Sequence, residues 1–376
     1  MTDSSNPAGN PVPTWTCRSC RSAAGPDAVV LELGEMPAAD HFPAPGDPGP
    51  DPAYGLSMWC CPECGLAQLT ADPTSADEPR GVEPAALQEQ AVAAVADVVA
   101  AGLLDGLAAQ TVTEFGSPHG GSWLGLFADR GWSQTDGPAS LVVDCFGIMH
   151  EPDQRAAAQA RADAVAPGGL LLVQFHTVEA IVTGGQWNAL RHGHFAYYSL
   201  ASLTRLFAPA GLHPLRAFEY ALYGGTVLVV FAAIGDPDHP SLETIRARER
   251  EAVGPAGLRT LQGAADQETA ELLGALEALV GAGRQVYGYG AASRAVALLS
   301  RAGVTPHELV AVADASVAKQ GRALPGSRIP IVGPDELVAA HPDVVLLLLP
   351  DLLPEVSRAY PTLAGRWRTT RQLTAC

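Results

Sequence analysis

The chain has 376 residues, a length that predicts two or three domains rather than one. Its composition is 47% hydrophobic and 17% charged, so a sizeable core can be buried. A net charge of −17 argues against nucleic-acid partners, because an acidic surface repels phosphate. The longest apolar run is too short to span a bilayer, and the first residues lack the order of a secretory signal. We therefore expect a cytoplasmic protein without a membrane segment.

Cysteines cluster early in the chain, after a disordered tail predicted for residues 1–14. Cys17-Arg-Ser-Cys20 and Cys61-Pro-Glu-Cys64 are two CxxC pairs, and two such turns can surround a metal with four thiolates. This pattern predicts a structural zinc site in a domain spanning residues 15–80, with Cys60 as a competing ligand. Buried structural cysteines or a redox pair are the alternatives, although neither pair follows a strand that leads into a helix.

Strands and helices alternate along the rest of the chain. Helices are predicted at 84–107, 154–166 and 200–210, and strands at 111–116, 141–146, 170–175 and 226–233. After a break at 235–240, the predicted helices are 241–253, 267–280 and 293–302, and the strands are 285–288, 309–314 and 344–349. The pattern predicts an α/β protein with a zinc-knuckle domain followed by two Rossmann-like, doubly wound parallel sheets. We place the two larger domains at 81–235 and 236–376.

A glycine turn follows the first strand of the middle domain. Glu114, Gly116 and Gly120 have ExGxxxG spacing, and His119 lies inside the turn. Glycines at such a turn let a cofactor approach the backbone at a helix N-terminus. Glycine also ends strands for steric reasons, so the pattern alone leaves both interpretations open.

The sequence resembles the sugar C-methyltransferases of deoxysugar biosynthesis. The resemblance covers most of the chain and is carried by residues 33–42, 61–69, 114–120, 150–153, 167–169, 287–294, 312–322 and 324–330. Members of this family act on nucleotide-linked keto-hexoses and combine a four-cysteine zinc domain, an S-adenosylmethionine (SAM) domain and a Rossmann-like C-terminal domain. The resemblance implies that Glu114, Gly116, His119 and Gly120 bind SAM and that the substrate is a dTDP-keto-hexose.

The middle domain departs from the family pattern. Thirty residues separate Glu114 from Asp144, which leaves room for a single βαβ unit. In the family the second strand ends in an acidic residue that binds the ribose, and only Asp136, on a short loop, stands in this stretch. Pro118 and His119 replace the family's Asn-Asp pair. Dimerisation of two chains is one way in which the contracted domain could be completed.

The segment from Arg191 to Ser199 corresponds to the family's Tyr-x-Glu-His segment. The resemblance makes His194 the general base that removes a proton beside the keto group, a role that suits an imidazole. Arg191 replaces the tyrosine and Gly193 the glutamate, so the arginine could stabilise an enolate oxygen or hold a phosphate. We expect His192 to be a solvated loop residue.

Two further residues match family positions in the middle domain. His176 lies near a second family histidine, and Tyr223 stands where the family has a histidine before Gly-Gly. We count both as candidate catalytic residues, while Tyr223 could instead simply pack in the core.

A second strand-to-helix turn lies in the C-terminal domain. Gly288 and Gly290 form it, Arg294 follows, and Asp314 ends the next strand, which is the layout of a dinucleotide fold. We expect these residues and Lys319, the single lysine, to bind the nucleotide diphosphate of the substrate. A fold kept without its ligand, with Lys319 on a solvated basic loop, is an equal alternative.

Three functions follow from these residues. The first is histidine-mediated enolisation of a nucleotide-linked keto-deoxysugar in natural-product biosynthesis, followed by methyl transfer from SAM. A SAM-independent epimerase or isomerase would need only the base and an oxyanion stabiliser. A non-catalytic scaffold with a methyltransferase fold is the third. The resemblance favours the methyltransferase.

Overall fold

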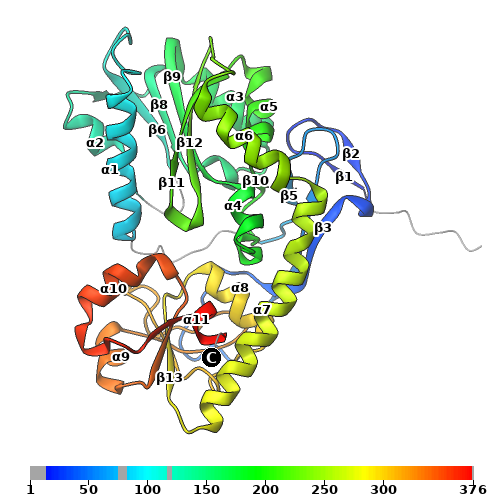
Figure 1. Ribbon diagram of the computed structural model, residues 1–376, viewed down its shortest axis with the longest axis vertical. Coiled ribbons are helices and arrows are strands. Elements are labelled where there is room, and N and C mark those ends of the chain that lie inside the picture. Colours follow the sequence, from blue (N-terminus) through cyan, green and yellow to red (C-terminus); the bar gives the residue numbers. More distant parts are fainter. Residues whose placement is uncertain (1–13, 75–82, 117–120, 375–376) are drawn as a thin grey trace, which may run out of the picture.

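The computed structural model describes residues 14–74, 83–116 and 121–374. These residues form an N-terminal part that bears the cysteines, a six-stranded middle sheet and a five-stranded C-terminal sheet. The two larger sheets follow one another along the long axis of the molecule, and helix α7 (Pro255–Gly281) runs from one to the other (Figure 1). The predicted fold class is confirmed.

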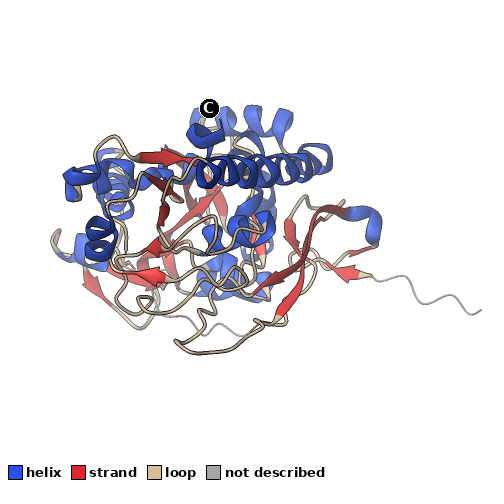
Figure 2. Cartoon of the chain, turned by 90° about the horizontal axis from the view of Figure 1, so that it is seen from below, coloured by secondary structure: helices blue, strands red, loops and turns tan. Residues whose placement is uncertain are grey.

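The N-terminal part is built from a short hairpin and a four-stranded antiparallel sheet, which stand at one side of the molecule (Figure 2). The sheet has the order β10-β5-β4-β3, so its edge strand β10 comes from the middle of the chain. The bounds are β1 (Trp15–Thr16), β2 (Ala23–Ala24), β3 (Val29–Pro37), β4 (Ala53–Cys60), β5 (Ala67–Leu69) and β10 (Ala196–Tyr197).

The middle sheet has the order β11-β12-β9-β8-β6-β7, with four parallel strands and an antiparallel pair at one edge. Side chains alternate across it, so Leu141 and Val143 meet helices α1 and α2 while Val142 faces α3, α5 and α6. The strands are β6 (Thr111–Phe115), β7 (Ser133–Gln134), β8 (Ala139–Cys145), β9 (Val165–His176), β11 (His213–Tyr220) and β12 (Thr226–Ala232). The helices are α1 (Ala85–Ala100), α2 (Leu124–Ala128), α3 (Gln154–Asp163), α4 (Val178–Thr183), α5 (Leu200–Phe207) and α6 (Pro240–Ala252).

The contraction expected between Glu114 and Asp144 takes a different form from the single βαβ unit predicted. A second strand, β7, is present and pairs in parallel with β6, but it is only two residues long. The chain then passes directly from Gln134 to β8 at Ala139, so no helix separates these strands. Asp136 lies on this connection and is exposed.

Several element boundaries also differ from the sequence-based predictions. Helix α1 ends at Ala100 rather than at 107, because Gly102 adopts a left-handed conformation just beyond its end. Helix α7 begins at Pro255, twelve residues before the predicted start, with proline in the first turn where it is tolerated. Strand β9 begins at Val165 and includes Pro167-Gly-Gly169, which we expected to precede the strand.

The C-terminal sheet is fully parallel, with the order β15-β14-β13-β16-β17. The strand order reverses between β13 and β16, the place where doubly wound sheets bind ligands beyond their carboxyl ends. Its strands are β13 (Val286–Tyr289), β14 (Val312–Ala313), β15 (Ile331–Val332), β16 (Val344–Leu347) and β17 (Trp367–Thr369). Its helices are α8 (Ser293–Ala302), α9 (Pro334–Ala340), α10 (Leu353–Ala359) and α11 (Thr370–Thr374). Among the helices of the described ranges, none has the length and apolar character needed to cross a membrane.

Candidate functional site

The two CxxC pairs meet in the N-terminal part. The Sγ atoms of Cys17, Cys20, Cys61 and Cys64 all lie within 4.8 Å of one another, and Cys17 to Cys64 is 3.5 Å. Thiolates around a tetrahedral zinc stand about 3.8 Å apart when each Zn–S bond is about 2.3 Å, so the four cysteines fit this metal. The Cys64 thiol lowers the pKa of Cys17, which favours the thiolate that a metal binds.

The remaining features of the cysteine region agree with a four-ligand site. Gly65 has φ +74 and completes the turn after the last cysteine, where its amide donates to the Cys61 carbonyl. Cys60, the competing ligand considered from sequence, is outside the cluster and packs in a different part of the core.

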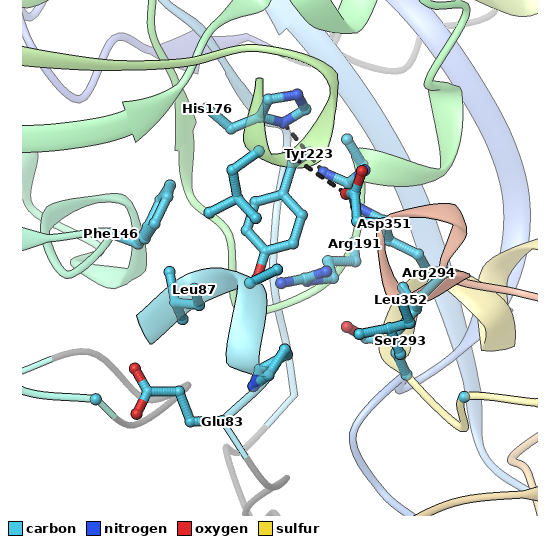
Figure 3. A pocket seen from close by; sticks show the side chains of 18 of the residues that line it. Glu83, Leu87, Phe146, His176, Arg191, Tyr223, Ser293, Arg294, Asp351 and Leu352 are labelled. Atoms are coloured by element: carbon cyan, nitrogen blue, oxygen red, sulfur yellow. Dashed lines mark hydrogen bonds between the residues drawn. The ribbon is translucent and has the colours of Figure 1, made fainter. Parts of the chain in front are cut away.

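A cavity lies between the middle sheet and the C-terminal sheet. Figure 3 shows Arg191 and Tyr223 in this space, with Leu87 and Phe146 of the middle domain on one side and Ser293 and Leu352 of the C-terminal domain on the other. All four candidate catalytic residues line it, and so do four residues of the C-terminal domain that were expected to bind substrate, namely Gly290, Arg294, Asp314 and Lys319. The sequence-predicted residues therefore meet at one place.

Arg191 and His194 form a hydrogen-bonded pair in this cavity. The Arg191 Nε donates to His194 Nε2 at 2.9 Å, so the neutral imidazole carries its proton on Nδ1. The Arg191 amide donates to the Tyr197 hydroxyl at 3.1 Å, which fixes the start of the segment. Both side chains are buried, and Gly193 between them has φ +80, a conformation that glycine adopts without strain.

His150 is a third member of this group that the sequence analysis did not single out. Its ring lies edge-on against His194, with 4.4 Å between ring centroids. Its Nδ1 donates to the Gly193 carbonyl at 2.9 Å, and burial lowers its pKa to about 4. His150 therefore stays neutral and packs as a wall beside His194. His192, expected to be solvated, is instead buried against Tyr54.

Arg294 reaches across the cavity from helix α8 to the middle domain. Its Nη1 donates to Gln186 Oε1 at 2.9 Å and its Nη2 to His176 Nδ1 at 3.1 Å, while its guanidinium lies 5.5 Å from the Tyr223 ring centre. Burial lowers the pKa of Arg294 to about 10, and the positive Arg191 lowers it further. It stays a cation at neutral pH, with no carboxylate within salt-bridge distance among the described residues.

His176 lies at the end of β9 and is almost fully buried. Burial, followed by the positive Arg294, lowers its pKa well below the ordinary value, so it accepts the arginine's hydrogen bond as a neutral ring. Tyr223 has φ 57 and stands between His176 and Phe146, with ring centroids 6.5 Å and 5.9 Å away. These contacts make His176 and Tyr223 supports of Arg294.

The glycine turn of the C-terminal domain opens on the same cavity. Gly290 has φ +98 and lines the cavity, whereas Gly288 is packed inside β13, where a Cβ would lie 2.9 Å from Val312. Asp314 accepts the Ala291 amide at 2.8 Å, and Lys319 donates to the Ala291 carbonyl at 2.8 Å. The two charged residues therefore hold the turn in shape.

The first glycine turn is described only at its two ends, because His119 and Gly120 lie outside the described residues. Glu114 accepts the Trp123 amide at 2.8 Å and the Ser122 hydroxyl at 2.5 Å, so its carboxylate organises the start of α2. Gly121 lines the cavity, and any Cβ there would meet the Glu83 carboxylate at 2.4 Å.

The ends of two central strands form the middle-domain wall of the cavity. Cys145 ends β8 and Phe146 follows it, while Gly121 and Trp123 follow the turn after β6. This crevice at the carboxyl ends of parallel strands is where such sheets bind cofactors. The narrow space over Gly121 is one that a side chain would fill, so these residues fit a cofactor of the SAM type.

Carboxylates from other parts of the chain also line the cavity and escaped the sequence analysis. Asp40 comes from the N-terminal part, and Asp351 and Glu355 come from the C-terminal domain. Asp351 accepts the Tyr223 amide at 3.1 Å and Glu355 accepts the Ala85 amide at 3.3 Å. Because each contact joins distant segments, no local sequence signal marks these residues.

Comparison with known families covers most of the chain in three matches. Residues 17–77 match the family described as "Putative zinc binding domain", residues 82–217 match "Methyltransferase domain", and residues 221–367 match "C-methyltransferase C-terminal domain". The chain belongs to the C-methyltransferase family. This assignment confirms the resemblance found in the sequence and the two cofactors expected of the C-methyltransferase, a structural zinc and SAM.

One curated relative of the C-methyltransferase is the C-methyltransferase NovU of Streptomyces niveus, 35% identical over 225 residues. The match covers 58% of this chain and 53% of NovU, so the chain spans about half the length of this relative.

Two solved structures were also matched. Magnesium protoporphyrin IX methyltransferase of Synechocystis PCC 6803 has a TM-score of 0.28 and 13% identity, covering 39% of this chain and 83% of its own. N-methyltransferase NodS of Bradyrhizobium japonicum WM9 has a TM-score of 0.26 and 16% identity, covering 40% and 98%. Scores this low add nothing to the family assignment.

Proposed function

We propose that the protein methylates a carbon atom of a nucleotide-linked keto-deoxysugar in natural-product biosynthesis, with SAM as the methyl donor. The observation that carries the proposal is the Arg191–His194 pair, which lies in a cavity lined by both the methyltransferase domain and the C-terminal glycine turn. The same cavity thus offers a base, a cation and two nucleotide-type turns.

In the proposed reaction, His194 removes the proton from the carbon beside the keto group through Nε2, which carries a lone pair. Arg191 moves from Nε2 to the substrate oxygen and stabilises the negative charge of the enolate. Until substrate arrives, the arginine keeps the imidazole neutral and oriented. His150 and Tyr197 limit the movement of the pair to this exchange of partners.

SAM supplies an electrophilic methyl group to the enolate carbon and leaves as S-adenosylhomocysteine. The residues that would hold it are Gly121, Trp123, Cys145 and Phe146, at the carboxyl ends of β6 and β8, with Leu87 closing the space. The apolar side chains exclude water from the enolate, which would otherwise be reprotonated.

The nucleotide of the substrate, which we assign to the dTDP-keto-hexose class, would occupy the C-terminal side of the cavity. Helix α8 begins at Ser293, directly after the Gly290 turn, so its amide groups face this space with partial positive charge. Arg294 and Lys319 add two cations on the same side. This combination suits a diphosphate, and Asp314 keeps the turn open to receive it.

The experiment that tests the proposal separates proton removal from methyl transfer. Zinc-loaded protein is incubated in D2O with a panel of dTDP-keto-hexoses, with and without SAM, and the sugars are analysed by mass spectrometry. We expect deuterium to enter the carbon beside the keto group, and one methyl group to be added when SAM is present. Absence of both changes for every sugar, with no SAM binding, would contradict the proposal.

The short strand β7 favours one second candidate, an epimerase or isomerase that acts without SAM. Asp136, which follows β7, does not line the cavity, so the acidic ribose ligand that the family resemblance implies has no counterpart there. The same experiment distinguishes this function, since deuterium exchange or epimerisation without any methyl transfer would identify it.

A further inference from the structure

The segment that carries the candidate base is also an edge strand of the zinc-domain sheet. Strand β10 begins two residues after His194 and pairs with β5, which begins three residues after Cys64. Ala196 is opposite Gln68, and the Leu69 amide donates to the Phe195 carbonyl at 3.2 Å. A single short strand therefore separates the metal ligands from the catalytic segment.

Gln68 joins this strand directly to the metal site. Its side chain is fully buried, and its Nε2 donates to Cys17 Sγ at 3.3 Å and to the Leu66 carbonyl at 3.3 Å. Its Oε1 accepts the Arg18 amide at 2.9 Å, inside the first CxxC turn. A buried thiolate needs such donors, because its negative charge is otherwise poorly solvated.

Two further contacts connect the zinc domain with the residues beside His194. Asp72 accepts the Gly193 amide and also holds Thr74, so it fixes the turn between Arg191 and His194. Arg18 donates to the Leu69 carbonyl at 2.5 Å, and its guanidinium lies 5.4 Å from the Phe195 ring centre. Both contacts come from residues adjacent to a cysteine turn or to β5.

We propose that the zinc site positions the Arg191–His194 pair, with Gln68 as the positioning residue that transmits the order of the metal site to β10. Zinc fixes the two CxxC turns, Gln68 ties the Cys17 turn to β5, and β5 fixes β10 by backbone pairing. The metal thus takes part in catalysis through geometry, at a distance from the reacting atoms. The meaning for catalysis rests on the proposed function, whereas the structural link can be measured without it.

The rest of the segment has supports that do not involve the metal. The Phe195 amide donates to the Met149 carbonyl at 2.8 Å, and the Tyr198 carbonyl accepts the Val178 amide at 2.8 Å. Loss of zinc should therefore loosen residues 191–197 and leave the six-stranded and five-stranded sheets intact. This local effect distinguishes positioning from general destabilisation.

The test uses the full chain with Gln68→Glu, which keeps the acceptor for Arg18 and replaces the donor to Cys17 with a carboxylate. Ser57→Ala is the matched control, because Ser57 bonds to Thr70 in the same sheet but lies outside the path to β10. Zinc affinity is measured by competition with a chromophoric chelator, and amide hydrogen exchange of residues 191–198 is followed by mass spectrometry. Deuterium exchange into a dTDP-keto-hexose is the third measurement.

We expect Gln68→Glu to weaken zinc binding by about tenfold to a hundredfold, the usual effect of removing a partner of a metal ligand. Hydrogen exchange in residues 191–198 should accelerate at limiting zinc and return towards the wild-type rate when excess zinc restores occupancy. Ser57→Ala should behave as wild type. If the proposed chemistry holds, substrate exchange should fall and recover in parallel.

Two results would overturn the proposal. One is unchanged hydrogen exchange of residues 191–198 in zinc-free protein, and the other is equal loss of protection in the five-stranded sheet. Absence of substrate exchange in zinc-loaded wild type, with zinc-dependent protection of the segment intact, would count against the proposed function alone.

Discussion

Chemistry at the scale of the residue depends on an arginine that faces a histidine. Arg191 donates to His194 Nε2 at 2.9 Å, the atom that is required to accept a proton in the proposed reaction. Such contact disfavours a second positive charge on the imidazole, so the base stays neutral until the arginine finds an anionic oxygen. The pair therefore couples activation of the base to arrival of the substrate.

The first prediction concerns Arg191→Met. This change should lower the rate of deuterium exchange at the carbon beside the keto group by about 100-fold, because removal of one preorganised donor to a developing oxyanion has effects of this size. Arg130→Met, on the exposed end of α2, is the control and should leave the rate unchanged. A variant of Arg191 with wild-type exchange would rule out its role at the enolate.

The second prediction concerns Arg294→Met, which removes a cation held by Gln186 and His176. We expect KM for the nucleotide-linked sugar to rise by about tenfold or more, with a smaller change in kcat, because the lost interaction binds ground state and transition state alike. Steady-state kinetics at several salt concentrations provides the measurement. An effect on kcat alone would place Arg294 at the reacting atoms instead.

Single elements join the site to the rest of the molecule. Helix α5 begins at Leu200, directly after the histidine segment, and its first amides donate to Glu249 of α6 and to the Ser199 side chain. Burial raises the pKa of Glu249 to about 7, although the Leu200 amide opposes this shift. The carboxyl group thus fixes the helix end that follows β10.

The third prediction is a pH-dependent effect of Glu249→Gln. The pKa of Glu249 in the folded chain, about 7, exceeds its ordinary value of 4.5, so folding takes up a proton between these values. The stability from this uptake is complete below pH 4.5 and lost as pH rises through 7, by about 1.4 kcal/mol for each unit of pKa difference. Thermal unfolding should therefore favour the variant over wild type increasingly from about pH 5 to pH 8. A constant difference would show that the pKa of Glu249 is not raised.

Local sequence signals predicted the features that depend on neighbouring residues. The CxxC spacing predicted the cysteine cluster, and glycine turns after short apolar strands predicted the positions of β6 and β13. His150 and Asp40 were missed, because their place beside the cavity depends on segments far apart in the sequence. The pairing of β10 with β5 was missed for the same reason, since two-residue strands have no recognisable period.

The whole molecule is held together by contacts that surround the cavity. Asp351 and Glu355 of the C-terminal domain accept backbone amides of the middle domain, and Arg294 crosses in the opposite direction. The N-terminal part reaches the C-terminal domain as well, where Arg328 pairs with the buried Asp51 at 2.5 Å. All three parts therefore meet around one cavity, and movement of any part would change its shape.

The fourth prediction concerns Arg328→Met, which leaves the carboxylate of Asp51 without its cation. Loss of one partner from a buried pair costs about 3–5 kcal/mol, and the partial exposure of Arg328 should reduce this to about 2 kcal/mol. Denaturant unfolding measures the change. Arg250→Met, which breaks the exposed pair with Glu243, is the control and should cost less than about 1 kcal/mol. Equal effects of both changes would contradict the proposed role of the Arg328 contact.

Calorimetric titration of zinc-loaded protein with SAM, and separately with S-adenosylhomocysteine, tests methyl transfer in this cavity most directly. Folded protein and zinc content are verified beforehand, so that the result reports on the cofactor site alone. We predict one binding site per chain with Kd in the micromolar range, equivalent to about 8 kcal/mol. No binding of either compound would contradict SAM-dependent methylation and leave cofactor-free enolisation as the chemistry of the Arg191–His194 pair.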